Sequence, residues 1–418
     1  MKTQQVRSDR AERTERDGQA GLAARSASPA SRWALVVGMV VIAANLRAPL
    51  TSVGPLVGTI RESLTLSAAW AGAITTLPLL AFALLSPFAS RLARRFGMET
   101  VLFAAIGLLA AGIAVRSLAG TAALFLGTAL LGLAIAVCNV LMPALVKREF
   151  PENVGMLTGV YSVSMNLCGA IASGVSVPLA AGAGLGWKGA LGCWAALALI
   201  AVALWLPQLR GRSRPSASPS AGVKPTKLWR SPLAWQVTLF MGLQSLIFYV
   251  TVAWLPAILG GRGMSAGTAG WMLSLLQFAL LPFTFVVPVL AGRMKSQRPL
   301  VALTTALYVV GIGGLLVGGN GWIPLWTIVL GIGGGFAFSL AMMFFTLRTR
   351  TAHEAAELSG MAQSVGYLLA AVGPALFGML HDAAGGWTAP LLLLLAASLL
   401  IFACGMGAAK RRYVDEER

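Results

Sequence analysis

A single arginine, Arg47, lies within an apolar stretch that extends from Trp33 to about Ile60. It is 14 residues after Trp33 and 13 before Ile60, so in a helix it lies ~20 Å from either end, near the middle of a bilayer. An arginine at that depth costs about 2.5–3.5 kcal/mol and cannot lose its charge. Its planar guanidinium could bind an anion or an electron-rich ligand in a water-filled cavity. Alternatively, it could donate hydrogen bonds to backbone carbonyls freed by Pro49 and Pro55.

Other polar side chains lie at similar depth, where lipid offers them no hydrogen-bond partner. They are expected to face the interior of a helix bundle and, together with Arg47, to form a substrate-binding site. Each Asn or Gln could instead join two helices by a hydrogen bond, and the tyrosines could be core packing. The candidates are Asn45, Asn139, Tyr161, Asn166, Gln244, Tyr249, Gln277, Gln363 and Tyr367.

Carboxylates are missing from the same depth. All fourteen Asp and Glu lie in tails, in loops or at the ends of apolar segments, and both histidines lie at segment ends. The four cysteines lie inside apolar segments without the spacing of metal ligands. The sequence therefore predicts neither an enzyme nor a metal or cofactor site, and it shows no intramembrane acid that could relay protons.

The composition is that of a polytopic membrane protein. Of 418 residues, 57% are hydrophobic and only 11% are charged, with a mean hydropathy of +0.78. The net charge of +18 could indicate nucleic acid. If the N-terminus is cytoplasmic, however, 27 of the 32 Lys and Arg fall in tails or cytoplasmic loops, and the positive-inside rule accounts for the excess. We therefore predict a multi-pass membrane protein with both termini cytoplasmic and no nucleic-acid partner.

Apolar segments divide the chain into two sets of six predicted transmembrane helices, an all-α fold. Residues 1–32 form a predicted disordered tail and 33–209 the first six-helix bundle. A Pro/Ser/basic cytoplasmic linker follows at 210–232, then the second bundle at 233–409 and a second cytoplasmic tail at 410–418. The twelve spans run roughly over 33–60, 68–91, 99–116, 121–146, 155–181, 187–208, 233–259, 267–292, 299–318, 322–347, 357–380 and 388–409.

The two halves resemble one another at an offset of about 200 residues. An even number of spans per half gives both the same orientation, so these are parallel repeats. This arrangement resembles the two six-helix halves of the major facilitator superfamily. The matching pairs are Leu157-Thr158-Gly159 with Leu358-Ser359-Gly360, Gly186-Trp187 with Gly386-Trp387, Ser86-Pro87 with Val287-Pro288, and Arg148 with Arg348.

Details of the segments resemble one branch of that superfamily, the cyanate/2-nitroimidazole porter family (CynX/NimT type). The resemblance covers residues 33 to 409, with Ala48 interrupting the family's usual Asn-Leu-Arg-Pro. The residues that carry it are Asn45-Leu46-Arg47-Ala48-Pro49, Val53-Gly54-Pro55-Leu56, Asn139 to Pro143, Arg148 to Pro151, Met156 to Ser162, Gly242-Leu243-Gln244-Ser245, Tyr249, Trp254-Leu255-Pro256, Met361-Ala362-Gln363-Ser364 and Gly366-Tyr367.

The resemblance implies a secondary transporter of the bacterial inner membrane that works by alternating access on a small anion or a small nitrogen-containing or heteroaromatic compound. The family includes a cyanate importer and a nitroimidazole exporter, so the direction of transport stays open. A broader drug or metabolite exporter is the alternative among transporters, and a non-transporting sensor is the alternative outside them. The usual state of this fold is a monomer, which we expect here, in contact with the lipid bilayer.

Overall fold

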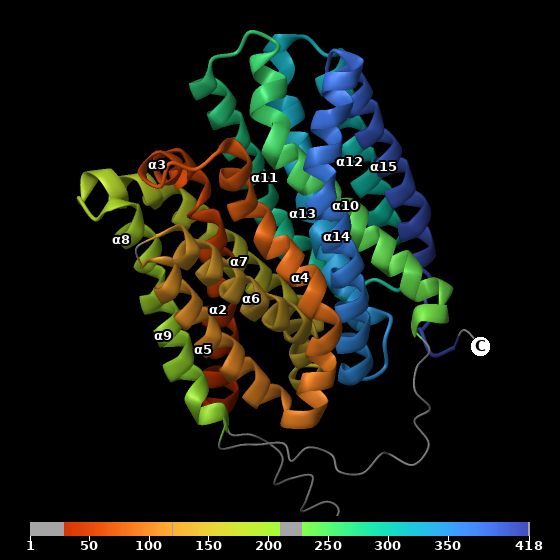
Figure 1. Cartoon of the computed structure of the whole chain (residues 1–418). Helices are drawn as coiled ribbons and strands as arrows, with labels where there is room; N and C mark the ends of the chain where they lie inside the picture. Colours follow the sequence, from red (N-terminus) through yellow and green to blue (C-terminus); the bar gives the residue numbers. More distant parts are fainter. Residues whose placement is uncertain (1–28, 119, 210–227, 417–418) are drawn as a thin grey trace, which may run out of the picture.

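The computed structural model describes residues 29–118, 120–209 and 228–416. Within those ranges the protein is entirely helical, and twelve helices are long and apolar enough to cross a membrane. The predicted all-α fold with twelve spans is therefore confirmed (Figure 1). The predicted tail at 1–32 and linker at 210–232 fall almost entirely outside the described residues.

The helices fall into two sets of similar order. The first half contains α2 (Pro29–Thr51), η1 (Gly54–Leu56), α3 (Val57–Ser63), α4 (Ala68–Phe96), α5 (Met98–Arg116), α6 (Thr121–Glu149), α7 (Val154–Val177), η2 (Pro178–Gly182), α8 (Gly186–Gly192), α9 (Trp194–Trp205) and η3 (Leu206–Leu209). The second half contains η4 (Leu228–Arg230), α10 (Pro232–Gly260), α11 (Ala266–Arg293), α12 (Arg298–Val317), η5 (Asn320–Trp322), α13 (Ile323–Leu347), α14 (Ala352–Ala384) and α15 (Thr388–Ala408).

Local sequence signals set the helix ends. Thr351 and Glu354 form a capping box that starts α14, and Gly385 ends it in the left-handed conformation with φ of 67°. The first predicted span is interrupted after Thr51, because Pro55 cannot donate a backbone hydrogen bond and the chain turns through η1 before α3 begins. Arg47 consequently lies one turn before the end of α2.

The two halves meet mainly through two pairs of helices, α4 with α14 and α7 with α11, and further contacts join α6 to α13 and α14 and α7 to α13. The beginning of α2 and the end of α15 lie on the same side of the molecule, which we call the tail-side face (Figure 1). The repeated glycines pack against the other half towards this face. A Cβ on Gly360 would lie 2.7 Å from the carbonyl oxygen of Ser86, and one on Gly159 would lie 3.0 Å from that of Phe285. These approaches require glycine.

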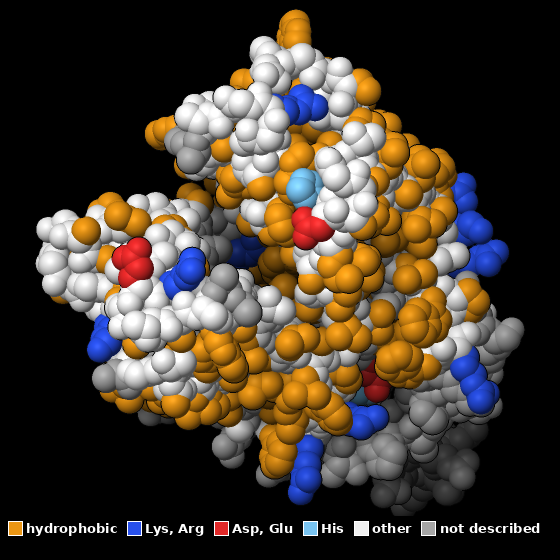
Figure 2. Space-filling model, turned by 45° about the horizontal axis from the view of Figure 1, so that its top comes forward, with side chains coloured by type: hydrophobic (Ala, Val, Ile, Leu, Met, Phe, Trp, Pro, Cys, Tyr) orange, Lys and Arg blue, Asp and Glu red, His pale blue; other side chains and the backbone are white. Residues whose placement is uncertain are grey.

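The halves separate on the face opposite the tails. Figure 2 shows a hollow there between the lobe that carries α3 and α8 and the lobe of the second half, with a basic side chain in its depth. On the tail side, by contrast, Lys147 Nζ at the end of α6 donates to the carbonyl oxygens of Thr346 and Thr349 at the end of α13. The conformation is thus closed on the tail side and open on the opposite face.

Candidate functional site

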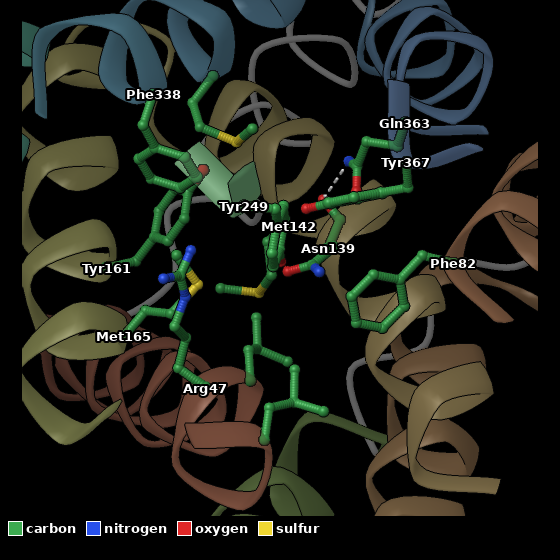
Figure 3. Close-up of a pocket in the computed structure, with 13 residues that line it drawn as sticks. Arg47, Phe82, Asn139, Met142, Tyr161, Met165, Tyr249, Phe338, Gln363 and Tyr367 are labelled. Carbon is green, nitrogen blue, oxygen red and sulfur yellow. Dashed lines mark hydrogen bonds between the residues drawn. The ribbon is translucent and has the colours of Figure 1, made fainter. Parts of the chain in front are cut away.

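Side chains from both halves enclose a small cavity at the centre of the molecule (Figure 3). The cavity has a volume of about 20 Å³, enough for about one water molecule. Helices α2, α4, α6 and α7 contribute one side, and α10, α13 and α14 contribute the other. The lining residues are Leu46, Arg47, Leu50, Phe82, Asn139, Met142, Tyr161, Met165, Tyr249, Phe338, Met342, Gln363 and Tyr367.

A second cavity of the same size, about 20 Å³, lies beside the first. The two share four lining residues, so the side chains that separate them belong to both. The shared residues are Arg47, Tyr249, Phe338 and Tyr367, and the second cavity adds Asn166, Gln244, Ser245, Phe248, Leu280 and Gly334.

The guanidinium of Arg47 lies against aromatic rings of the opposite half. Its Cζ is 5.1 Å from the ring centroid of Phe248 and 6.0 Å from that of Phe338, both within cation–π range. Gly169 on α7 makes room for the stem, since a Cβ there would lie 3.0 Å from the Cβ of Arg47. Among the described residues no carboxylate and no backbone carbonyl pairs with this guanidinium. Its donors face the cavities instead.

A related structural role, donation to a backbone carbonyl at the end of α2, is seen for Arg116. This side chain is fully buried at the end of α5, and its Nη1 donates to the carbonyl oxygen of Pro49 over 2.6 Å. That carbonyl lies in the last turn of α2, where helical partners are missing and a cation is favoured. The end of α2 is therefore held by Arg116, and Arg47 is left to face the cavities.

Two buried polar groups in the first cavity have no partner among the described residues. Gln363 uses its Nε2 to donate to the Asn139 carbonyl oxygen (3.1 Å) and to Ser359 Oγ (2.7 Å), which leaves its Oε1 unpaired. The hydroxyl of Tyr161 is also buried and unpaired. A ligand with both donor and acceptor atoms could satisfy these groups, since leaving them unpaired is unfavourable.

The tail side of the first cavity is closed by contacts between α14 and the first half. The ring of Tyr367 packs edge-on against Phe82 at a centroid distance of 4.9 Å. One turn earlier, Ser364 Oγ donates to the carbonyl oxygen of Ala83 over 2.6 Å. Together with the Gln363 bond to α6, these contacts separate the cavity from the tail-side face.

The amides that line the second cavity make local hydrogen bonds. Asn166 Nδ2 donates to the carbonyl oxygen of Ser162 over 2.8 Å, and Gln244 Nε2 donates to Ser245 Oγ over 2.7 Å. Since an amide oxygen accepts and its nitrogen donates two hydrogen bonds, each of these groups keeps some capacity for a ligand.

Two of the predicted site residues lie elsewhere. Asn45 Nδ2 donates to the carbonyl oxygens of Val41 (2.8 Å) and Leu197 (3.2 Å), so it joins α2 to α9. Gln277 on α11 lines neither cavity. Both are polar residues within long apolar helices. A helix can contact more than one neighbour inside the bundle, and these two side chains lie on faces that do not line the cavities. The other eight predicted residues line one or both cavities.

The aromatic contacts of Arg47 were missed from the sequence. Phe248 lies 201 positions after Arg47, close to the offset between the repeats, so the duplication could have indicated that these positions face each other. Phe338 carries no such signal, because a phenylalanine in an apolar helix is indistinguishable from core packing.

Comparison with known proteins places this geometry in a family. The family model of the Major Facilitator Superfamily matches residues 34–374. The uncharacterized transporter YycB of Bacillus subtilis (strain 168) is 49% identical over 381 residues, covering 91% of this chain and 94% of the relative. The 2-nitroimidazole transporter of Escherichia coli (strain K12) is 46% identical over 393 residues, covering 93% and 98%. The cyanate transport protein CynX of the same strain is 27% identical over 359 residues, covering 84% and 91%.

Among solved structures, the proton:xylose symporter XylE bound to 6-bromo-6-deoxy-D-glucose matches with a TM-score of 0.75 at 12% identity. The match covers 92% of this chain and 98% of the symporter. At that identity it supports the fold alone. The family model and the relatives that match over nearly their full length also show the type of protein. These relatives are transporters, not enzymes. The chain therefore belongs to the Major Facilitator Superfamily, and within it to the transporters of the cyanate/2-nitroimidazole type.

Proposed function

We propose that this transporter moves a small planar compound that is anionic or rich in electrons, such as cyanate or a nitroimidazole. The observation that carries the proposal is the unpaired guanidinium of Arg47 at the interface between the halves. A buried cation without a counter-ion is costly, so the site favours an anion or an electron-rich group that approaches it. The guanidinium fork suits a nitro group or a small anion.

The rest of the site supports a flat ligand with two different ends. Arg47 and the Tyr161 hydroxyl supply donors for an electron-rich end, and Gln363 Oε1 supplies an acceptor for an N–H or O–H group. The aromatic rings of Phe248 and Phe338 offer apolar faces beside the guanidinium. A nitroimidazole could accept from the donors, donate to the acceptor and pack against the rings. Cyanate could accept from the donors.

We infer that transport proceeds by alternating access, with the tail-side face in the cytoplasm and the chain acting as a monomer in the inner membrane. The positive-inside distribution supports this orientation. The ligand would enter the hollow on the opposite face, reach Arg47, and leave after the contacts of Lys147, Gln363 and Ser364 across the halves break. The described lining of both cavities contains no carboxylate, so coupling would not pass through an acid beside the ligand.

The test is ligand-induced thermal stabilisation of the purified protein, measured across small anions and nitrogen heterocycles. Arg47→Lys keeps the charge and loses the fork, so we expect about tenfold weaker binding; Arg47→Gln loses both, and we expect about 100-fold weaker binding. Arg61→Gln on the exposed α3 is the matched control and should bind like the parent protein.

Three outcomes would contradict the proposal. If Arg47→Gln binds as tightly as the parent but unfolds at a markedly lower temperature, the arginine is structural, and the site passes to Asn139, Gln244 and Gln363. If bulky cations bind and are transported, the broader exporter is the better assignment. If ligands bind but no flux occurs in vesicles, the protein is a sensor.

A further inference from the structure

An apolar groove lies on the outer side of the contact between α7 and α11. Its residues repeat every three to four positions on each helix, so they form one face of each. On α7 they include Val160, Ser164 and Leu167, and on α11 they include Phe285 and Val286. The groove has a volume of about 550 Å³, and its lining is apolar except for Ser164, whose hydroxyl bonds to the carbonyl oxygen of Val160. It lies at the depth of the lipid tails.

A basic hollow of about 590 Å³ lies at the tail-side end of the same two helices. Lys147, Arg293 and Arg350 line it, and Glu152 is the carboxylate in its described lining. Residues Asn153 to Met156, at the beginning of α7, also line it. The amide groups at the beginning of a long helix favour an anion, and the three cations add to that preference.

The groove and the hollow lie about one helical turn apart on the same two helices. Met156, which lines the hollow, is four residues before Val160 in the groove; Val289, also in the hollow, is three residues after Val286. Residues at this spacing share a face of a helix, so on each helix the apolar groove is followed, towards the tail-side end, by the basic hollow. We propose that an anionic phospholipid binds along this face, with an acyl chain in the groove and its phosphate in the basic hollow.

The hydrogen-bonding state of the cations identifies the phosphate ligands. Arg293 is exposed and makes no ion pair with a described residue, so its whole guanidinium is available. Lys147 Nζ bonds to two neutral carbonyl oxygens and retains its charge for a third partner. Arg350 is already engaged by Asp415 and Glu416. Arg293 is therefore the principal contact of the phosphate and Lys147 the second one.

The bound lipid bridges the two halves, because α7 belongs to the first and α11 to the second. Basic pockets between transmembrane helices at this membrane edge are suited to anionic headgroups. A ligand that contacts both halves here binds the conformation that is closed on the tail side and loses its site when the halves part. It therefore favours that conformation.

The experiment titrates the purified full-length protein in detergent with phosphatidylglycerol and follows its unfolding temperature. Phosphatidylcholine and glycerol 3-phosphate are titrated in parallel as a zwitterionic lipid and as a soluble phosphate. Arg293→Gln removes the main phosphate contact, and Arg298→Gln, exposed on the same face outside the hollow, is its matched control. Ser164→Phe fills the groove without a change in charge, and Leu199→Phe on the exposed side of α9 is its control.

We expect phosphatidylglycerol to raise the unfolding temperature of the parent and of both controls. Arg293→Gln and Ser164→Phe should each need about fivefold more lipid for the same rise. Equal stabilisation by phosphatidylcholine, or an undiminished response of both test variants, would overturn the proposal. Stabilisation by glycerol 3-phosphate at the same concentrations would show a site for a free phosphate and overturn the lipid assignment. No substrate is present, so the result is independent of the proposed transport function.

Discussion

The two halves use the same anchor at their tail-side ends. In the first half, Arg148 at the end of α6 forms an ion pair with Glu99 at the beginning of α5. In the second half, Arg348 at the end of α13 donates to Gln297 Oε1 immediately before α12. The arginines are 200 positions apart and occupy matching places, so the duplication preserved the anchor but changed its acceptor from a carboxylate to an amide.

The other hydrogen bonds of Gln297 explain why an amide is found at this position. Gln297 Nε2 donates to the carbonyl oxygens of Ala291 (3.0 Å) and Met294 (3.1 Å) at the end of α11 while its oxygen accepts from Arg348. A carboxylate can accept but cannot make both donations. The second half therefore joins three helices where the ion pair of the first half joins two. Without an acid at this position, burial lowers the pKa of Arg348 to about 10.

The halves differ most at the centre, where the ligand is proposed to bind. The first half supplies the cation Arg47, and the second supplies the rings of Phe248 and Phe338 that it faces. A strictly symmetric pair of halves would place two arginines here, which would repel each other, or two phenylalanines, which would bind no anion. Divergence at the matched positions Arg47 and Phe248 therefore produces a site that has one charged side and one aromatic side.

The largest effect on stability is expected from the arginines that cap helix ends on the face opposite the tails, one in each half. Arg116 is fully buried and binds the end of α2, whereas the half-exposed Arg262 donates to the carbonyl oxygens of Leu315 and Gly318 at the end of α12. Arg116→Ala leaves a cavity and removes the Nη1 donor from the Pro49 carbonyl oxygen, which keeps the bond from Ser52 Oγ at 3.3 Å, so it should lower the free energy of unfolding by about 3 kcal/mol. Arg262→Ala should cost about 1 kcal/mol, since water can replace its hydrogen bonds.

Unfolding of the purified variants measures both effects. Arg116→Met is the matched control, because it removes the charge and retains most of the volume; we expect a loss of about 1 kcal/mol. If Arg116→Met were more stable than the parent, the cost of burying the cation would outweigh its contribution as a helix cap. Arg116 would then destabilise the protein, whereas Arg262 stabilises it.

An exchange of the tail-side acceptors tests the second difference. Gln297→Glu places a negative charge beside Arg348 and raises the pKa of that arginine, yet it loses two buried donations to α11. We therefore expect a net loss of about 2 kcal/mol in stability. Glu99→Gln removes only the charge, and Arg148 keeps Glu149 at 2.6 Å, so the loss should be about 1 kcal/mol. Chemical denaturation of both variants gives the comparison, and a Gln297→Glu protein more stable than the parent would show that charge alone decides the acceptor.

The smallest effect is expected where the halves are joined. The predicted linker at 210–232 is rich in Pro, Ser and basic residues and should not contribute to the transport path. Residues 1–215 and 216–418, expressed together as separate chains, should associate and retain flux close to that of the intact chain. Loss of flux from an associated pair would show that the linker does more than connect two self-sufficient bundles.

The sequence predicted the membrane-spanning architecture well but the helix ends less well. Hydropathy detects a span because lipid leaves no backbone group unpaired, and all twelve spans were found in this way. It does not detect where a helix continues into water. The span predicted at 357–380 extends as α14 from Ala352 to Ala384, because the capping box and Gly385 define its ends. Conversely, the apolar stretch after Thr51 reads as continuous although the chain turns there.

For the site, polarity in an apolar helix indicated which residues avoid lipid, but not which neighbour they contact. Asn45 and Arg47 are two positions apart and therefore point in different directions, the first towards α9 and the second into the cavities. Only the arrangement of the helices distinguishes them. The partners Phe248 and Phe338 became identifiable only once the two halves were packed together.

The glycine contacts between the halves have a consequence for the speed of the transport cycle. Where Gly360 meets Ser86, backbone lies against backbone, and Gly159 lies against the carbonyl oxygen and the ring of Phe285. Parting the halves breaks the directed bonds of Lys147, Gln363 and Ser364 and separates the ring of Tyr367 from that of Phe82. Water can take over each of the directed bonds as it forms a path between the halves. Turnover should therefore respond to hydration of the interface as well as to the bulk of its side chains.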